Sequence, residues 1–333
     1  MPGKGMTPQK NMTPQKNMTP TVTTGVYPAV LTPFLADGAV DYERIPAYAD
    51  FLISRGVTGL FALGSNGLFP LLEHEERRRV LTAYVEAAAG RVPVWAHVGA
   101  VTTAEAAALA REAGDAGASA VAVVAPYYYR LDEAALFAHF VTVARATSVP
   151  VFLYNIPSNT GNDLPPGLLT RVADASANVI GIKDSSRDFA HVQAVLSEAQ
   201  RYERRPLHVL VGTEDYLLPA LLLGASGTVS GVSNAFPEAA VDVLSAWREQ
   251  RLPEMRAAQE RLGTLRAILN SGPTITPNYA ALSMRGFPVG LPRRPLRPLE
   301  QHEEERLATA LRHEGWFARR DVHLRAGASA SDD

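Results

Sequence analysis

One lysine stands apart from the other basic residues of this 333-residue chain. Only four of its 32 lysine and arginine residues are lysine, and three of these lie within the first sixteen residues. The fourth, Lys183, ends a run of apolar residues typical of a buried strand. Arginine stays protonated and cannot form an imine, whereas a lysine in apolar surroundings loses its proton readily and attacks carbonyl groups. Lys183 is therefore a candidate for Schiff-base chemistry; the alternative is a structural lysine paired with Asp184 or another carboxylate.

Two further polar sites come at the ends of other apolar runs. Tyr154 comes at the end of the run 149–155, where a phenol beside an amine could carry a proton to and from a reacting hydroxyl. The alternative is a core tyrosine, the usual role of a lone tyrosine in a strand. Residues 64–67, Gly-Ser-Asn-Gly, predict a tight turn after another run. Its backbone N–H groups and short polar side chains, Ser65 and Asn66, suit a carboxylate.

The elements that must position these residues follow from the hydrophobic pattern. Short apolar and β-branched runs alternate with amphipathic stretches that begin with acidic residues and end with glycine, as helices do. Eight strands are predicted, over 26–34, 59–64, 92–99, 119–126, 149–155, 178–184, 207–212 and 226–231. Eight βα units fit an α/β protein of the (β/α)8 barrel type better than a doubly wound sheet, which more often has five or six strands.

The barrel does not account for the whole chain. Residues 1–22, with MTPQKN repeated, are predicted to be a disordered tail or a cloning remnant, and 23–236 the barrel. Residues 237–316 contain three or four more helical segments, which we expect to form a C-terminal helical extension, and 317–333 read as a tail. Barrel enzymes carry their chemistry at the carboxyl ends of the strands. Strict alternation there would put Val179, Gly181 and Lys183 on one face of their strand.

Composition excludes several classes of function. A net charge of −2 leaves no surplus of positive charge for nucleic acid or an anionic membrane. The absence of cysteine excludes disulfides and thiolate sites and fits a cytoplasmic protein. Residues 216–237 carry no charge over a length that could span a bilayer, but glycine, serine and proline break the stretch into short elements. We therefore expect no membrane segment.

The histidines and one cluster of arginines suggest no further site. The eight histidines show no metal-ligand spacing, so no metal is expected. His97 is interpreted as a hydrogen-bonded interior residue. Arg77, Arg78 and Arg79 are interpreted as a solvated, ion-paired face of a helix.

Five motifs in combination resemble a known family. They are Thr32-Pro33-Phe34, the turn 64–67, Pro126-Tyr127-Tyr128-Tyr129, Tyr154-Asn155-Ile156-Pro157 followed by Thr160-Gly161, and Gly181-Ile182-Lys183-Asp184. Over roughly residues 24–315 the chain is similar to the pyruvate-dependent class I aldolases and lyases related to dihydrodipicolinate synthase and N-acetylneuraminate lyase.

The resemblance implies roles for particular residues. Lys183 would form the Schiff base, Tyr154 would act as acid and base, and Ser65 would relay protons. Tyr128 would complete that relay in the adjacent subunit, which implies an oligomer, a homotetramer built as a dimer of dimers. Asn66 would help to hold the pyruvate carboxylate. The other predicted substrate-binding residues are Thr32, Gly67, Asn159, Val229 and, as an alternative clamp for a substrate acid, Arg130.

Two departures from the family pattern narrow the expected substrate. Dihydrodipicolinate synthases carry an arginine at the position of Asn159, where it binds the carboxylate of the second substrate. Asparagine there is similar to 4-hydroxy-2-oxoglutarate aldolases. Leu68, in place of the usual glutamate, and the three tyrosines 127–129 are more similar to 2-keto-3-deoxygluconate aldolases and suggest a wider, partly apolar mouth.

We therefore expect a carbon–carbon lyase that cleaves a 2-oxo-4-hydroxy acid to pyruvate and an aldehyde through an imine on Lys183, with no cofactor. One alternative is a synthase that condenses pyruvate with aspartate semialdehyde, or a dehydratase using the same imine. Another is a non-catalytic protein that binds a small-molecule 2-oxo acid. The sequence does not identify the aldehyde.

Overall fold

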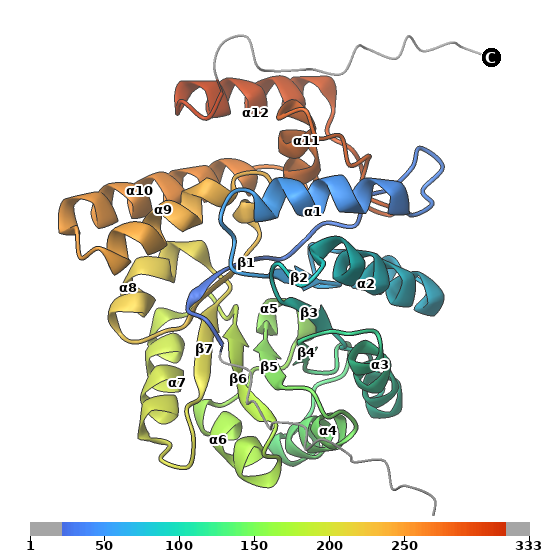
Figure 1. The fold of residues 1–333 in the computed structure, drawn as a ribbon, viewed down its shortest axis with the longest axis vertical. Helices are drawn as coiled ribbons and strands as arrows, with labels where there is room; N and C mark the ends of the chain where they lie inside the picture. Colours follow the sequence, from blue (N-terminus) through green and yellow to red (C-terminus); the bar gives the residue numbers. More distant parts are fainter. Residues whose placement is uncertain (1–21, 318–333) are drawn as a thin grey trace, which may run out of the picture.

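The computed structural model describes residues 22–317, in which eight parallel strands form one sheet (Figure 1). Apart from Val22 and Phe317, the tails predicted for residues 1–22 and 317–333 lie outside the described part. Strands follow one another around the sheet in chain order from β2 to β8, and β8 pairs with β1. Their bounds are β1 (Gly25–Pro28), β2 (Leu60–Ala62), β3 (Val94–His97), β4 (Ala120–Val124), β5 (Val151–Asn155), β6 (Val179–Asp184), β7 (His208–Val211) and β8 (Gly227–Ser230).

The sheet closes at the end of β1. This strand ends at Pro28, so the predicted strand 26–34 was too long. The Ala29 N–H donates to Ser230 O in β8 at 2.9 Å, and the next N–H, that of Val30, donates to Phe61 O in β2 at 3.0 Å. A parallel bridge between Ala29 and Phe61 completes the contact. The chain thus passes from one neighbour to the other within two residues, and the predicted (β/α)8 barrel is confirmed.

Helices surround the barrel and extend beyond it (Figure 1). The longer ones are α1 (Ile45–Ile53), α2 (His74–Ala88), α3 (Thr103–Asp115), α4 (Glu133–Arg145), α6 (Pro166–Ala175), α7 (Phe189–Arg201), α8 (Leu217–Leu222), α9 (Pro237–Arg248), α10 (Leu252–Leu269), α11 (Thr276–Met284) and α12 (Gln301–His313). A one-turn helix, α5 (Pro157–Thr160), follows β5, and the 3₁₀ turns are η1 (Tyr42–Arg44), η2 (Phe69–Leu71), η3 (Glu214–Tyr216) and η4 (Val232–Asn234). Residues 237–316, where three or four further helical segments were predicted, contain α9 to α12, so the presence of C-terminal helices is confirmed.

Aromatic side chains stack on one another inside the barrel, beside smaller aliphatic ones. The Trp95 ring stacks between Tyr27 at 4.0 Å and Phe152 at 4.7 Å between ring centroids. These rings belong to a buried cluster that is separate from the larger core under the helices. The filled interior leaves the carboxyl ends of the strands as the place for a site.

Strand β6 departs from strict alternation. Val151 pairs with Val179, but the next residue, Phe152, pairs with Gly181, so Ile180 is an extra residue in the strand. This bulge puts Val179 in the core under the helices, and the prediction that it shares a face with Lys183 is wrong. A side chain at Gly181 would overlap the backbone of His208, so glycine is required by the close approach of β7.

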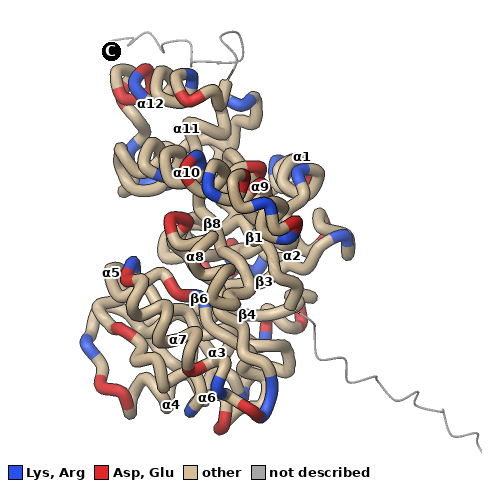
Figure 2. Tube along the Cα trace, turned by 90° about the vertical axis from the view of Figure 1, so that its left-hand side faces the viewer, with Lys and Arg blue, Asp and Glu red and all other residues tan. Residues whose placement is uncertain are grey.

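Charged residues lie along the surrounding helices and loops, with both signs interspersed (Figure 2). The uncharged stretch 216–237 is divided among α8, a turn, β8 and η4, as predicted. Within residues 22–317 no helix is both long and apolar enough to cross a lipid bilayer.

Candidate active site

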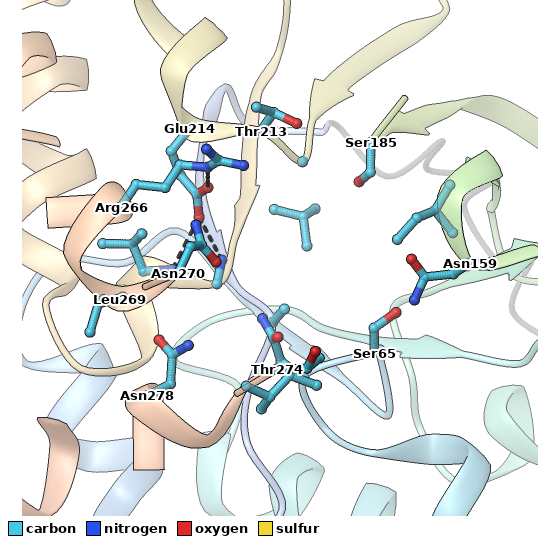
Figure 3. A pocket seen from close by; sticks show the side chains of 18 of the residues that line it. Ser65, Asn159, Ser185, Thr213, Glu214, Arg266, Leu269, Asn270, Thr274 and Asn278 are labelled. Carbon is cyan, nitrogen blue, oxygen red and sulfur yellow. Dashed lines mark hydrogen bonds and ion pairs between the residues drawn. The ribbon is translucent and has the colours of Figure 1, made fainter. Parts of the chain in front are cut away.

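A cavity of about 390 Å³ opens at the carboxyl ends of the barrel strands (Figure 3). Strand ends and the loops after them supply one part of its wall, and the end of α10, the start of α11 and the segment between them supply the rest. In Figure 3, Ser65, Ser185 and Asn159 lie on one side of the cavity, and Glu214, Arg266, Asn270 and Asn278 lie on the other. The residues with polar or charged side chains in its lining are Ser65, Asn66, Tyr154, Asn159, Lys183, Ser185, Arg187, Thr213, Glu214, Arg266, Asn270, Thr274 and Asn278.

Lys183 and Tyr154 are direct neighbours on β6 and β5. The Lys183 Nζ lies 3.9 Å from the centre of the Tyr154 ring and 4.7 Å from the centre of the Phe61 ring. Only 4% of Lys183 and 2% of Tyr154 is exposed. Gly212 at the end of β7 makes room for them: a Cβ there would overlap the Ser185 hydroxyl and lie 3.2 Å from Lys183 Cε.

The Tyr154 hydroxyl is placed for proton transfer. Its oxygen lies 3.4 Å from Ser65 Oγ. Burial by itself would raise the pKa of Tyr154, but the positive charge of Lys183 and hydrogen bonds with Ser65, Lys183 and Ser185 lower it below the ordinary value of 10. A phenol with a lowered pKa that touches both an amine and a hydroxyl can act as an acid and a base.

The neighbouring carboxylate, Asp184, is engaged away from the amine. Its Oδ2 lies 3.0 Å from His191 Nδ1 and accepts a hydrogen bond from Asn155 at 3.1 Å. Its Oδ1 accepts from the Ser186 hydroxyl at 2.6 Å. No ion pair involves Lys183 within residues 22–317, so the structure gives no support to the alternative of a lysine paired with Asp184.

Glu214 and Arg266 form a charged wall that the sequence did not reveal. Glu214 Oε1 accepts hydrogen bonds from the Ser230 hydroxyl at 2.9 Å and from the Gly231 and Val232 N–H groups at 2.7 and 3.0 Å. The Arg266 guanidinium contacts Glu214 Oε2 at 3.1 Å (Figure 3). It also contacts Asp215 Oδ2 at 2.6 Å. This cluster ties α10 to the ends of β7 and β8 and so fixes the shape of the cavity.

The other predicted site residues fall into two groups. Asn66, Asn159 and Val229 line the cavity. Thr32 and Gly67 do not: the Thr32 hydroxyl donates to Gly67 O at 2.6 Å, so each holds the other behind the wall formed by Ser65 and Asn66.

Tyr128 and Arg130 lie on the surface, outside the cavity lining. Tyr128 is 85% exposed, with its ring against that of Tyr129 at 5.0 Å between centroids. The Arg130 guanidinium donates to Gly161 O at 3.3 Å. Neither side chain reaches the cavity of its own chain.

Leu68 also lies away from the mouth of the cavity, contrary to expectation. It is buried in the core at 3% exposure, and its φ of 57° turns the chain into η2. Tyr127 is half-buried beside Phe69, with 6.0 Å between the ring centroids. An apolar mouth formed by Leu68 and the tyrosines is therefore wrong for the single chain, and the outer wall is formed instead by polar residues between α10 and α11.

His97 and Arg77 differ from their sequence interpretations. His97 is buried, and its ring packs on Phe69 at 4.3 Å between centroids; the backbone of Leu63 is its nearest polar partner, but neither ring nitrogen makes a hydrogen bond of good geometry within residues 22–317. Burial, and then the charges of Arg77 and Lys183, keep the pKa of His97 well below 6.5. Arg77 is 6% exposed and donates to Gly99 O at 3.1 Å, so it does not belong to a solvated face. Arg78 does pair with exposed Glu75.

Comparison with known proteins places this arrangement in a family. The model of the dihydrodipicolinate synthetase family matches residues 22–314. A curated relative from Methanococcus aeolicus, a 4-hydroxy-tetrahydrodipicolinate synthase, is 32% identical over 87% of this chain and 99% of its own. An Escherichia coli relative, "Putative 2-dehydro-3-deoxy-D-gluconate aldolase YagE", is 35% identical over 86% of this chain and 96% of its own.

The solved structures agree with these relatives. The crystal structure of YagE from Escherichia coli K12 in complex with pyruvate superposes with a TM-score of 0.83 at 34% identity, covering 87% of this chain and 98% of that one. The similarity therefore extends over the barrel and most of the C-terminal helices. The chain belongs to the dihydrodipicolinate synthetase family, whose members are lyases.

Proposed function

We propose that the protein is a Schiff-base aldolase that cleaves a 2-oxo-4-hydroxy acid, a 2-keto-3-deoxy sugar acid or 4-hydroxy-2-oxoglutarate, to pyruvate and an aldehyde. The observation that carries the proposal is the buried pair of Lys183 and Tyr154 in the cavity, with Nζ 3.9 Å from the phenol ring. The relatives include proteins named as aldolases and proteins named as synthases. We favour the aldolase because the position at which synthases carry an arginine is occupied by Asn159, which lines the cavity.

The proposed reaction begins at Lys183. Its amine adds to the C2 carbonyl, and the carbinolamine loses water to give an imine. Tyr154 then takes the proton of the C4 hydroxyl, the C3–C4 bond breaks, and its electron pair passes into the imine to form an enamine while the aldehyde leaves. Protonation of C3 and hydrolysis release pyruvate and restore the amine. Ser65 would relay the proton from Tyr154, and Asn66 would bind the carboxylate at C1.

This chemistry needs only the chain's own residues and the substrate, so we propose no cofactor. We also propose a cytoplasmic homotetramer. The support for an oligomer is Tyr128, which is 85% exposed and does not line the cavity of its own chain. A neighbouring subunit would bury it.

The imine is tested by trapping. Incubation with pyruvate and borohydride should add one reduced pyruvate adduct per chain, located by peptide mass spectrometry on Lys183. Lysines 4, 10 and 16 are internal controls because they lie in the terminal segment. An unlabelled protein, or label on those three lysines alone, would contradict the proposal and leave the non-catalytic binding protein.

The synthase is the second candidate because the Methanococcus aeolicus relative is named for that activity. It is distinguished by comparing kcat/KM for cleavage of 2-keto-3-deoxygluconate, cleavage of 4-hydroxy-2-oxoglutarate and condensation of pyruvate with aspartate semialdehyde. Loss of a charge-assisted contact costs about 1.5 to 3 kcal/mol, or roughly one to two orders of magnitude. Asn159 should therefore make condensation the slowest of the three, and a faster condensation would favour the synthase.

A further inference from the structure

Three basic side chains line the cavity, and only one has its charge available at the outer part of the site. Lys183 is the proposed nucleophile. Arg266 is neutralised by Glu214 at 3.1 Å and Asp215 at 2.6 Å. Arg187 has no side-chain hydrogen bond or ion pair within residues 22–317, and its residue is exposed. The cavity therefore presents an uncompensated guanidinium at Arg187.

The backbone holds Arg187 in an unusual conformation. Its φ is 61°, in the left-handed region that residues with a side chain rarely adopt. Such a conformation persists only where the surroundings impose it, and it is concentrated at functional sites.

Hydrogen bonds on both sides impose that conformation. The Tyr216 hydroxyl donates to Arg187 O at 2.9 Å. Before Arg187, the Ser186 N–H and hydroxyl donate to Asp184 Oδ1 at 3.0 and 2.6 Å. After it, the Asp188 carboxylate accepts from the Ala190 N–H at 2.9 Å and begins α7. The loop from the end of β6 to α7 thus has a fixed course that brings Arg187 to the cavity.

The chemistry of a guanidinium restricts what Arg187 can bind. Its planar N–H donors match carboxylate and phosphate oxygens, with two parallel hydrogen bonds. Among residues 22–317, Glu214 is the only carboxylate in the cavity lining, and it already accepts four hydrogen bonds from Ser230, Gly231, Val232 and Arg266. A ligand must therefore supply the anion.

We propose that Arg187 binds an anionic group on the aldehyde half of the substrate, so that the preferred 2-oxo-4-hydroxy acid carries a second carboxylate or a phosphate beyond C4. This inference rests on the proposed aldol cleavage, in which Lys183 holds the pyruvate half. It gives Arg187 the specificity role for which the sequence suggested Arg130, whose guanidinium lies outside the cavity and donates to Gly161 O.

Four arginine variants and three substrates test the proposal. Arg187→Gln removes the charge, and Arg187→Gly removes the side chain while fitting the positive φ. Arg130→Gln tests the competing residue, and Arg111→Gln, at an exposed position on α3 outside the cavity, is the matched control. Pyruvate release is measured from 4-hydroxy-2-oxoglutarate, from 2-keto-3-deoxy-6-phosphogluconate and from the neutral-ended 2-keto-3-deoxygluconate.

We expect both Arg187 variants to lose at least about tenfold in kcat/KM for one anionic substrate, as the loss of a charged hydrogen bond predicts, and less than about threefold for the neutral-ended one. Which anionic substrate is affected identifies carboxylate or phosphate as the group bound. Arg111→Gln should match the unsubstituted protein. Equal losses on all three substrates, no loss, or a selective loss only in Arg130→Gln would overturn the proposal.

Borohydride trapping of pyruvate tests this inference separately from the proposed Schiff-base function on which it rests. If the unsubstituted protein and Arg187→Gln both form the adduct on Lys183 but do not differ in substrate preference, the role of Arg187 is wrong and the Schiff-base function stands. If the unsubstituted protein forms no adduct, both are wrong.

Discussion

Tyr154 and Lys183 lie opposite each other in the parallel ladder of β5 and β6, and the amine lies 3.9 Å from the centre of the phenol ring. The register fixes this relationship, because the pairs Leu153 with Ile182 and Asn155 with Asp184 come directly before and after it. The lowered pKa of the phenol, to which the charge of Lys183 contributes, is thus a consequence of one strand pairing.

Replacing Tyr154 with phenylalanine should keep the fold and lower turnover by roughly two to four orders of magnitude, the usual size of a general acid–base contribution. The ring would still fill its place beside Lys183, so the melting temperature should change little. Steady-state pyruvate release and thermal unfolding measure the two effects. Tyr202→Phe, at a tyrosine whose hydroxyl bonds to Asp174 on the outer surface, is the control. Near-normal turnover in Tyr154→Phe would return this tyrosine to a structural role.

The buried carboxylate of Glu214 should be essential to the shape of the cavity. Glu214→Gln replaces the carboxylate with a neutral amide and so removes the ion pair with Arg266. It also puts an amide N–H group among donors that now converge on the carboxylate. Breaking a buried charged network typically costs about 3 kcal/mol of unfolding free energy. Chemical denaturation should show such a loss, whereas Asp215→Asn, at a side chain that is 42% exposed, should cost less than about 1 kcal/mol. Equal stabilities of the two variants would show that the network contributes little.

The strands and the central pair of site residues follow from the sequence because they depend on local patterns. Apolar runs of strand length, separated by amphipathic helices, predict eight strands in chain order, and chain order makes β5 and β6 neighbours. Lys183 and Tyr154 end those two runs, so their proximity needs no tertiary information. The bulge at Ile180 and the early end of β1 depend on how the neighbouring strands pair, which the sequence pattern does not encode.

The outer half of the site could not be predicted in this way. Arg266 lies in α10 and Asn270 directly follows it, and nothing in their local sequence indicates that they fold over the cavity. Arg187 looks like an ordinary polar loop residue until its φ and its missing partner are known. The opposite holds for Tyr128 and Leu68. Their motifs suggest the mouth of the site, but Tyr128 lies on the surface and Leu68 lies in the core.

Stability should depend on the protonation of His191. Its hydrogen bond with Asp184, opposed by burial and aided by the charge of Asp184, raises the pKa of His191 from 6.5 to about 9. A histidine whose pKa rises on folding stabilises the folded state fully below its unfolded pKa, and this contribution is lost as the pH rises through the folded pKa. The melting temperature should therefore fall between about pH 6.5 and 9.

The matching variant is His191→Gln, which can still donate to Asp184 or to Leu164 O but does not titrate. Its melting temperature should be lower than that of the unsubstituted protein at pH 6 and should lack the decline attributed to His191. Parallel pH profiles for the two proteins would contradict this assignment. His302→Gln, at a side chain that is 64% exposed, is the control for a histidine on the surface.

Tyr128 should act in the site of a neighbouring subunit. It is 85% exposed in the chain and held at a φ of 84°, which is unusual for a residue with a side chain and directs it outward beside Tyr129. Lys183→Ala and Tyr128→Phe should then each be nearly inactive alone. In a hybrid dimer, the Tyr128→Phe chain keeps its lysine and receives the tyrosine of its partner, so one of the two sites is complete. Random exchange of equal amounts should restore about a quarter of the unsubstituted activity, because half of the dimers are hybrids.

Subunit exchange is followed by native mass spectrometry of differently labelled chains. Full exchange without recovery of activity would show that each site is complete within its own chain.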